Sequence, residues 1–165
     1  MDASLIYFDY NHIFAAQLAM CTITLDGVAL KLCLSVDRLV ITGSAVVRGK
    51  VDLSMAILGK VSNRFKGAQI SINWLEKIFD KLLDDSTEEV IQQYAQAFIM
   101  RLIGGILMLD NSRNLVHIRW LRHLMDFSEC TKLSWGSSVL STLYRELRRA
   151  NQLDKMSISG CLLLL

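Results

Sequence analysis

The sequence predicts a mainly α-helical fold, a compact helical domain with a small irregular or β-containing N-terminal portion. Apolar residues make up 52% of the 165 residues, enough for one domain to bury a core. In the second half of the chain they recur every three or four residues, which is the spacing of one helix face. Proline is absent, which fits either a helix-rich chain whose loops use other residues or the loss of earlier prolines. We find no internal repeat or linker and expect residues 1–165 to form a single domain.

The N-terminal third predicts one helix followed by an extended segment. Thr24 is a suitable N-cap, because its hydroxyl can accept a hydrogen bond from an N–H of the first turn. The apolar face of this helix consists of Leu25, Val28, Ala29 and Leu32. Residues 33–44 indicate an extended arm or a small hairpin around Asp37 and Arg38, although the turn lacks the usual glycine. Residues 45–70 favour no single element.

Two consecutive helices are predicted next. Ser71 caps the first, which ends near Asp84 and Asp85. Its apolar face consists of Leu75, Ile78, Phe79, Leu82 and Leu83. Ser86 and Glu89 form a capping box, in which each residue satisfies a free N–H of the other, and this box begins the second helix.

The second of these helices is the central one, since it is apolar on several faces over residues 90–106. Gly104 and Gly105 lie inside it, and each glycine costs a helix about 1 kcal/mol. The pair therefore indicates a close helix contact or a kink. The apolar run over residues 97–109 is interrupted by Arg101 and is shorter than the roughly 20 residues that span a bilayer. We expect a buried helix and no membrane span.

The C-terminal third predicts a turn over residues 110–112 and two further helices. The shorter helix carries Trp120, Leu121, Leu124 and Met125. Ser134 caps the longer one, which carries Val139, Leu140, Leu143, Tyr144 and Leu147. Core packing is the expectation for the three tryptophans, Trp74, Trp120 and Trp135. Ser157 is predicted to start one more helix, and we expect the domain to be incomplete where the chain stops at Leu165.

Several long segments resemble the plant mobile domain, which occurs in MAINTENANCE OF MERISTEMS-like proteins and in plant transposons. The resembling segments are CTITLDGVALKLCLSVDRLVITGS (21–44), FKGAQISINWLEKIF (65–79), EEVIQQYAQAFIMRLIGGILMLDNSRNLVHIRWLRHLMDF (88–127), LSWGSSVLSTLYRELRRA (133–150) and SGCLLLL (159–165). The chain departs from the family at residues 33–35, where a Gly-Leu-Pro turn is usual, and at residues 61–63, where prolines are usual. The family also continues past the final leucines with a tryptophan-rich segment.

The resemblance implies a helical, non-catalytic interaction module of a plant nuclear protein. It implies residence in the nucleus, nuclear protein partners, and a role in meristem maintenance and in transposon silencing or genome stability. The alternative is a nucleic-acid-binding remnant of a transposon-encoded protein. The family has no established catalytic residues, so none is transferred to this chain.

Enzyme motifs are missing from the sequence, although family members carry names such as "aminotransferase-like" and "phosphatase 7 long form homolog". The GDxHG, GDxxDRG and GNHE motifs that hold two metals in metallophosphatases are absent. A glycine-rich phosphate cradle and a GxSxG nucleophile turn are absent as well. We therefore expect no enzyme, no cofactor and no small-molecule substrate.

Two groups of possible metal ligands have simpler explanations. His117, His123 and Cys130 are separated by six and seven residues, which does not match ligands on a single turn or knuckle. A carboxylate cluster consists of Asp80, Asp84, Asp85, Glu88 and Glu89. These acids lie at one helix end and the next helix start, where the helix dipole and solvation account for them. The four scattered cysteines form no CxxC pair and indicate reduced thiols in an intracellular protein.

The basic residues of the C-terminal third are the candidate binding groups. The net charge of +2 is too small by itself to indicate nucleic-acid binding. Residues 113–155 nevertheless hold eight basic and four acidic residues, whereas residues 71–110 hold three basic and seven acidic residues. The candidate contacts with nucleic acid or a partner are Arg119, Arg122, Arg145, Arg148 and Arg149. The last three share one helix face and can meet phosphates, or they simply form a solvated face near a helix C-terminus, where cations are favoured.

Overall fold

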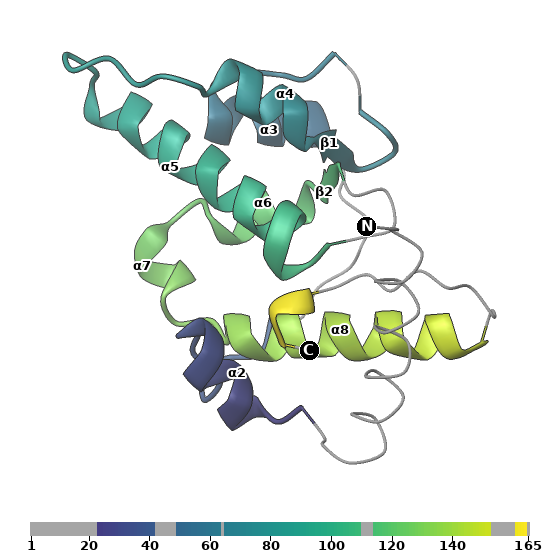
Figure 1. The fold of residues 1–165 in the computed structure, drawn as a ribbon. Coiled ribbons are helices and arrows are strands. Elements are labelled where there is room, and N and C mark those ends of the chain that lie inside the picture. Colours follow the sequence, from purple (N-terminus) through teal and green to yellow (C-terminus); the bar gives the residue numbers. More distant parts are fainter. Residues whose placement is uncertain (1–22, 42–48, 64, 110–113, 153–160, 165) are drawn as a thin grey trace, which may run out of the picture.

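The computed structural model describes residues 23–41, 49–63, 65–109, 114–152 and 161–164 (Figure 1). The helices of this part are α2 (Leu25–Leu32), α3 (Lys50–Leu58), α4 (Ile72–Ile78), α5 (Glu88–Leu102), α6 (Arg119–His123), α7 (Phe127–Cys130) and α8 (Trp135–Gln152). Two further turns are the π-helical segment η1 (Ile103–Leu107) and the 3₁₀ turn η2 (Leu162–Leu164). The strands are β1 (Gln69–Ser71) and β2 (Leu115–His117). The mainly α-helical fold class is confirmed.

The helices are arranged in two groups with a connecting layer between them. Helices α3, α4 and α5 form one group, and the long helix α8 forms the other together with α2 and η2 (Figure 1). The segment from β2 through α6 and α7 runs between the groups (Figure 1). Apolar side chains of every layer are fully buried, for example Leu75 of α4, Met100 of α5, Leu121 of α6 and Leu143 of α8. The described part therefore shares one hydrophobic core.

A two-stranded antiparallel sheet lies in the middle of the chain. Strands β1 and β2 pair with Gln69 opposite His117 and Ile70 opposite Val116. The central pair, Ile70 and Val116, is buried in the core, so this register is set by burial. The N–H of Ile118 also donates to the carbonyl of Ala68 at 2.8 Å, which extends the pairing toward α6. The sheet thus fixes the start of α6 beside the start of β1, and α6 packs against α3 and α5.

The predicted first helix is confirmed, although Leu25 of its predicted apolar face is exposed. Helix α2 begins after Thr24, whose Oγ1 accepts a hydrogen bond from the N–H of Gly27 at 3.2 Å. The segment after it has a bend at Asp37 and Arg38, and Leu39 forms an isolated parallel bridge with Leu133. The β structure of the chain is therefore not limited to the N-terminal portion, because β1 and β2 lie further along.

Two predicted helix boundaries were wrong. The helix after Ser71 ends at Ile78 and does not reach Asp84. Phe79 leaves the helix to pack edge-on against the ring of Tyr94, with centroids 5.1 Å apart. As a result, Leu82 and Leu83, which were predicted to be core residues, are exposed.

The central helix begins at Glu88 with Thr87 as its N-cap, and its cap makes no side-chain hydrogen bond. The predicted capping box of Ser86 and Glu89 is therefore wrong. Helices α3 and α7 were not predicted. Helix α3 exposes Val51 and Met55, so its apolar residues follow no clean helical face.

The remaining expectations have mixed outcomes. Helix α6 buries Trp120, Leu121 and the following Leu124 as predicted, but Met125 is exposed. All three tryptophans pack in or against the core, as predicted. The turn at residues 110–112 and the start at Ser157 lie outside the described residues.

The glycine pair of the central helix marks a close contact, with strand β2 and with the first residue of helix α4. The α-helix ends at Leu102 and continues as the wider π-helical segment η1. A Cβ atom added to Gly104 would lie 2.6 Å from the Cβ of Val116 on β2 and 3.0 Å from Cδ1 of Ile72. A Cβ atom added to Gly105 would meet no atom within 4 Å. Only the first glycine is therefore required by packing.

Candidate functional site: an arginine pocket between two helix groups

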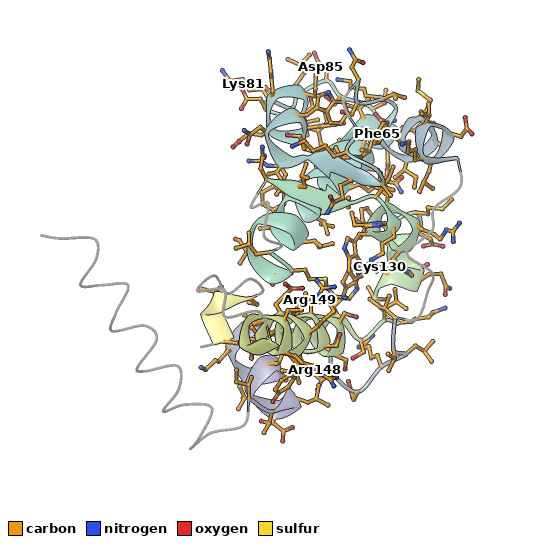
Figure 2. All side chains as sticks on the ribbon, turned by 90° about the vertical axis from the view of Figure 1, so that its right-hand side faces the viewer. Phe65, Lys81, Asp85, Cys130, Arg148 and Arg149 are labelled. Atoms are coloured by element: carbon orange, nitrogen blue, oxygen red, sulfur yellow. The ribbon has the colours of Figure 1, made fainter. Side chains whose placement is uncertain are left out.

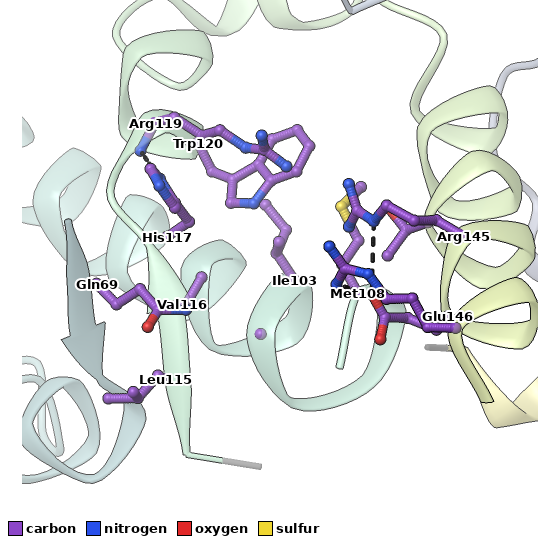
Figure 3. A pocket seen from close by; sticks show the side chains of 13 residues that line it. Gln69, Ile103, Met108, Leu115, Val116, His117, Arg119, Trp120, Arg145 and Glu146 are labelled. Carbon is purple, nitrogen blue, oxygen red and sulfur yellow. Dashed lines mark hydrogen bonds and ion pairs between the residues drawn. The ribbon is translucent and has the colours of Figure 1, made fainter. Parts of the chain in front are cut away.

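A pocket of about 260 Å³ lies between α8 and the segment that contains η1, β2 and α6 (Figure 3). Its apolar wall is formed by Ile103, Gly104, Met108 and Val116. Its charged wall is formed by Arg145, Glu146 and Arg149, which all project from α8. His117, Arg119 and Trp120 complete the lining from the β2–α6 segment. Residues far apart in the sequence therefore meet around one cavity.

The charged wall is organised around a buried carboxylate. Glu146 is only 7% exposed, and its Oε1 accepts hydrogen bonds from Arg149 Nη1 at 2.9 Å and from Arg145 Nε at 3.4 Å. The two arginines are separated by four residues, so they lie on the same face of α8. Their side chains remain about half exposed. One carboxylate thus orients two guanidinium groups toward the pocket, and it neutralises only one of their two positive charges.

Arg119 supplies a third cation from the opposite side (Figure 3). Its guanidinium carbon lies 4.6 Å from the ring centroid of Trp120, which is a cation–π contact. Its Nε is buried and has no hydrogen-bond partner among the described residues. Burial, and then repulsion by Arg145, lower the pKa of Arg119 below its usual value. An aromatic face rather than an acid of the described chain therefore holds this cation in place.

His117 adds a neutral donor to the lining. Its Nδ1 accepts a hydrogen bond from the backbone N–H of Arg119 at 3.1 Å. Burial, and then the charge of Arg119, lower the pKa of His117. The ring is therefore neutral near pH 7, and the proton assigned from this hydrogen bond lies on Nε2.

The residues of this pocket belong to a sequence with clear relatives. The plant mobile domain family matches residues 11–165. The chain belongs to the plant mobile domain family. The expected resemblance is therefore confirmed.

Three curated relatives from Arabidopsis thaliana illustrate the similarity. "Serine/threonine-protein phosphatase 7 long form homolog" is 36% identical over 94% of this chain and 12% of its own length. "Protein MAIN-LIKE 1" is 31% identical over 92% of this chain and 31% of its own length. "Protein MAINTENANCE OF MERISTEMS" is 28% identical over 87% of this chain and 30% of its own length. The chain thus spans less than a third of these relatives, and no solved structure matches it significantly.

The fold of this chain brings together three of the five predicted contact residues. Arg119, Arg145 and Arg149 line the pocket. Arg122 and Arg148 are exposed and do not line it. Figure 2 labels Arg148 and Arg149 on different sides of α8. The three arginines predicted to share one face of α8 therefore divide into a pocket pair and a surface residue.

Sequence reasoning missed His117, Trp120 and Glu146 as parts of the site. Glu146 had a usable signal, because it is the one acid within the basic run of α8 and lies three residues before Arg149. For His117 and Trp120 the sequence contains no such signal, because only the pairing of β1 with β2 and the folding of α6 place them beside α8.

The side chains of this chain that were considered as metal ligands form no common site in the described part. Across the described ranges, no three His, Cys, Asp or Glu side chains converge in a way that could hold a metal ion. The carboxylates of Asp80, Asp84 and Asp85 are exposed in the segment between α4 and α5. Among the helices that the structure describes, we find no candidate for a membrane span.

Proposed function

We propose that this chain is a non-catalytic interaction module of a plant nuclear protein that serves meristem maintenance and transposon silencing. Its family is related to meristem maintenance, as the name of one relative states. The observation that carries the proposal of an interaction role is the arginine pocket, which is built to hold an anionic group of a partner.

The chemistry of the pocket favours binding over catalysis. The Oε1 of Glu146 is shared by two guanidinium groups, so this carboxylate is poorly placed to act as a base. The Nδ1 of His117 accepts a backbone hydrogen bond, which leaves Nε2 protonated and unable to take a proton. The arginines carry fixed charge and several N–H donors each. This set of groups can attract and orient an anion, while proton transfer by it is unfavourable.

Nucleic-acid binding is the second candidate function, and exposed cations favour it. Arg122 and Arg148 lie on the surface outside the pocket and are free to meet phosphates. If this alternative is right, the chain binds duplex DNA with strong salt dependence, and charge reversal at Arg145, Arg148 and Arg149 abolishes binding. A salt titration of DNA binding by fluorescence anisotropy tests it.

A domain exchange tests the interaction role. The corresponding domain of Protein MAINTENANCE OF MERISTEMS is replaced by this chain, and meristem activity and transposon transcripts are measured in plants that lack the original protein. We expect rescue by the exchanged domain, loss of rescue with R119M, and rescue with the matched surface variant R148M. Nuclear localisation is read from a fluorescent tag on the same protein.

An activity assay tests the non-catalytic part of the proposal. The purified chain is incubated with an aryl phosphate and, in parallel, with DNA in the presence of Mg²⁺ or Mn²⁺. We expect turnover at the background rate. Turnover that depends on the protein concentration contradicts the proposal.

A further inference from the structure

We propose that the arginine pocket binds a phosphate monoester carried on a protein side chain, such as phosphoserine or phosphothreonine. This inference rests on the proposed function, because it names the group through which a partner is held. Three properties of the pocket carry it: its free donors, its net charge and its shape.

The pocket retains many N–H donors after its internal ion pairs are formed. A guanidinium group carries five N–H donors. The hydrogen bonds to Glu146 use the Nε of Arg145 and the Nη1 of Arg149. The two Nη groups of Arg145 and the Nε and Nη2 of Arg149 are not used by those bonds. Glu146 is therefore a positioning residue that holds two planar donor groups while leaving them able to bind oxygen atoms.

Arg119 approaches the same space from the opposite wall (Figure 3). Its ring contact with Trp120 leaves the edge of the guanidinium plane without an acidic partner among the described residues. Burial lowers the pKa of Arg119 because it disfavours the charged guanidinium, and an anion beside the guanidinium would favour the charged form. The Nε2–H of His117 offers one more neutral donor from this side.

The charge of the pocket suits a dianion. Three guanidinium groups face one carboxylate, and His117 is neutral, so the lining carries a net charge of +2. A phosphorylated side chain carries about −1.5 to −2 charges at neutral pH. A nucleic-acid phosphodiester carries one charge, and its binding gains strength from many contacts along a track. A single cluster of three guanidinium groups around one cavity therefore fits a monoester better than a nucleic-acid backbone.

The shape of the pocket points to a side chain. Its volume of about 260 Å³ lies below the range of about 300–1,000 Å³ that is typical of sites for whole small molecules. Its apolar wall is made of Ile103, Met108 and Val116. A phosphorylated side chain can place its oxygens against the arginines and its aliphatic carbons against this wall. Recognition of phosphorylated motifs by arginine clusters is an established mode of peptide binding.

The test compares small probes on the whole chain by isothermal titration calorimetry. The probes are N-acetyl-O-phosphoserine-N-methylamide, the same compound without phosphate, inorganic phosphate, and a short DNA duplex. We expect the phosphoserine probe to bind at least tenfold more tightly than the other three. R119M should weaken that binding at least tenfold, R119K should weaken it less, and R148M should leave it unchanged.

Each other outcome overturns the inference. No binding of the phosphoserine probe refutes it, and equal binding of inorganic phosphate shows that no side chain is recognised. Tighter binding of DNA that R119M abolishes assigns the pocket to nucleic acid. Thermal unfolding of each variant verifies that a loss of binding reflects the pocket and not the fold.

The same variants separate this inference from the proposed function. If R119M abolishes rescue in the domain exchange while the phosphoserine probe fails to bind, the ligand is wrong and the interaction role stands. If the probe binds but R119M still rescues, the pocket is a phosphate site without the proposed role.

Discussion

The two walls of the arginine pocket are built by different forces. On the apolar wall, Gly104 and Val116 pack so closely that no Cβ atom fits between them. On the charged wall, Arg145 and Arg149 are half exposed and are held by one buried carboxylate, Glu146. The first wall contributes stability through close packing, and the second keeps donors available at some cost in stability. Disturbing the packing or removing the buried carboxylate should therefore destabilise the fold, whereas removing the cation of Arg119 should not.

The largest effect is expected at the apolar wall. Gly104→Ala should reduce the free energy of unfolding by about 3 kcal/mol, because its Cβ would overlap Val116 and force β2 or η1 to move. Gly105→Ala is the matched control, because its Cβ would meet open space. That neighbouring substitution should be neutral or stabilising by up to about 1 kcal/mol, since alanine favours a helix. Urea unfolding of both variants measures the difference, and equal effects would contradict the packing argument.

A smaller loss is expected when the charged wall loses its carboxylate. Glu146→Gln should reduce the free energy of unfolding by about 2 kcal/mol, because two guanidinium groups lose a shared buried partner and repel each other. Exposed Glu129, which pairs with Lys132 at 2.5 Å, provides the control. Glu129→Gln should leave the urea midpoint unchanged, since exposed ion pairs contribute little. An unchanged midpoint in Glu146→Gln would show that Glu146 does not organise the wall.

A gain in stability is expected at Arg119. Arg119→Met should raise the free energy of unfolding by about 1 kcal/mol, because it removes a buried donor without a partner in the described residues and a repulsion with Arg145. Loss of the cation–π contact with Trp120 offsets part of this gain. Thermal and urea unfolding measure it. A clear loss of stability would mean that the guanidinium of Arg119 makes favourable contacts in the folded chain. The argument that it is suited to bind an anion would then fail.

The smallest effect is expected from pH. Burial lowers the pKa values of His117 and His123 below their usual value of about 6.5. The unfolded chain therefore binds more protons than the folded chain once the pH falls below about 6.5, so stability decreases there and is unaffected by these rings at higher pH. Unfolding measured between about pH 7.5 and pH 5.5 should show this decline. A variant with H117Q and H123Q should have a flatter profile, and an unchanged profile would contradict the pKa assignment.

Local signals in the sequence were sufficient for several parts of the fold. Thr24 caps α2 as predicted, because capping depends on a side chain and the next few N–H groups. The apolar periodicity of α8 likewise predicted the burial of Val139 and Leu143. Helix ends were less predictable. The helix after Ser71 ends at Ile78, and the ring of the next residue, Phe79, packs on Tyr94, a contact that no local pattern contains.

The candidate site was predicted in part for the same reason. Spacing of four residues placed Arg145 and Arg149 together on α8, since helix geometry alone decides which residues share a face. Spacing also grouped Arg148 with them, although it lies outside the pocket. Helical periodicity does not tell which part of a polar face will be covered by another element. Arg119 was predicted as a contact residue, but its position opposite α8 was not.

The mainly helical fold and the cations of the C-terminal third could be predicted from composition and from spacing along the chain, and the family from the resemblance of long segments. The packing of β2 against Gly104 and the position of Arg119 across a pocket from Glu146 became evident only in the folded chain. The physical reason is that these contacts join segments distant in the sequence. Their geometry follows from how the whole core packs, and no local pattern records it.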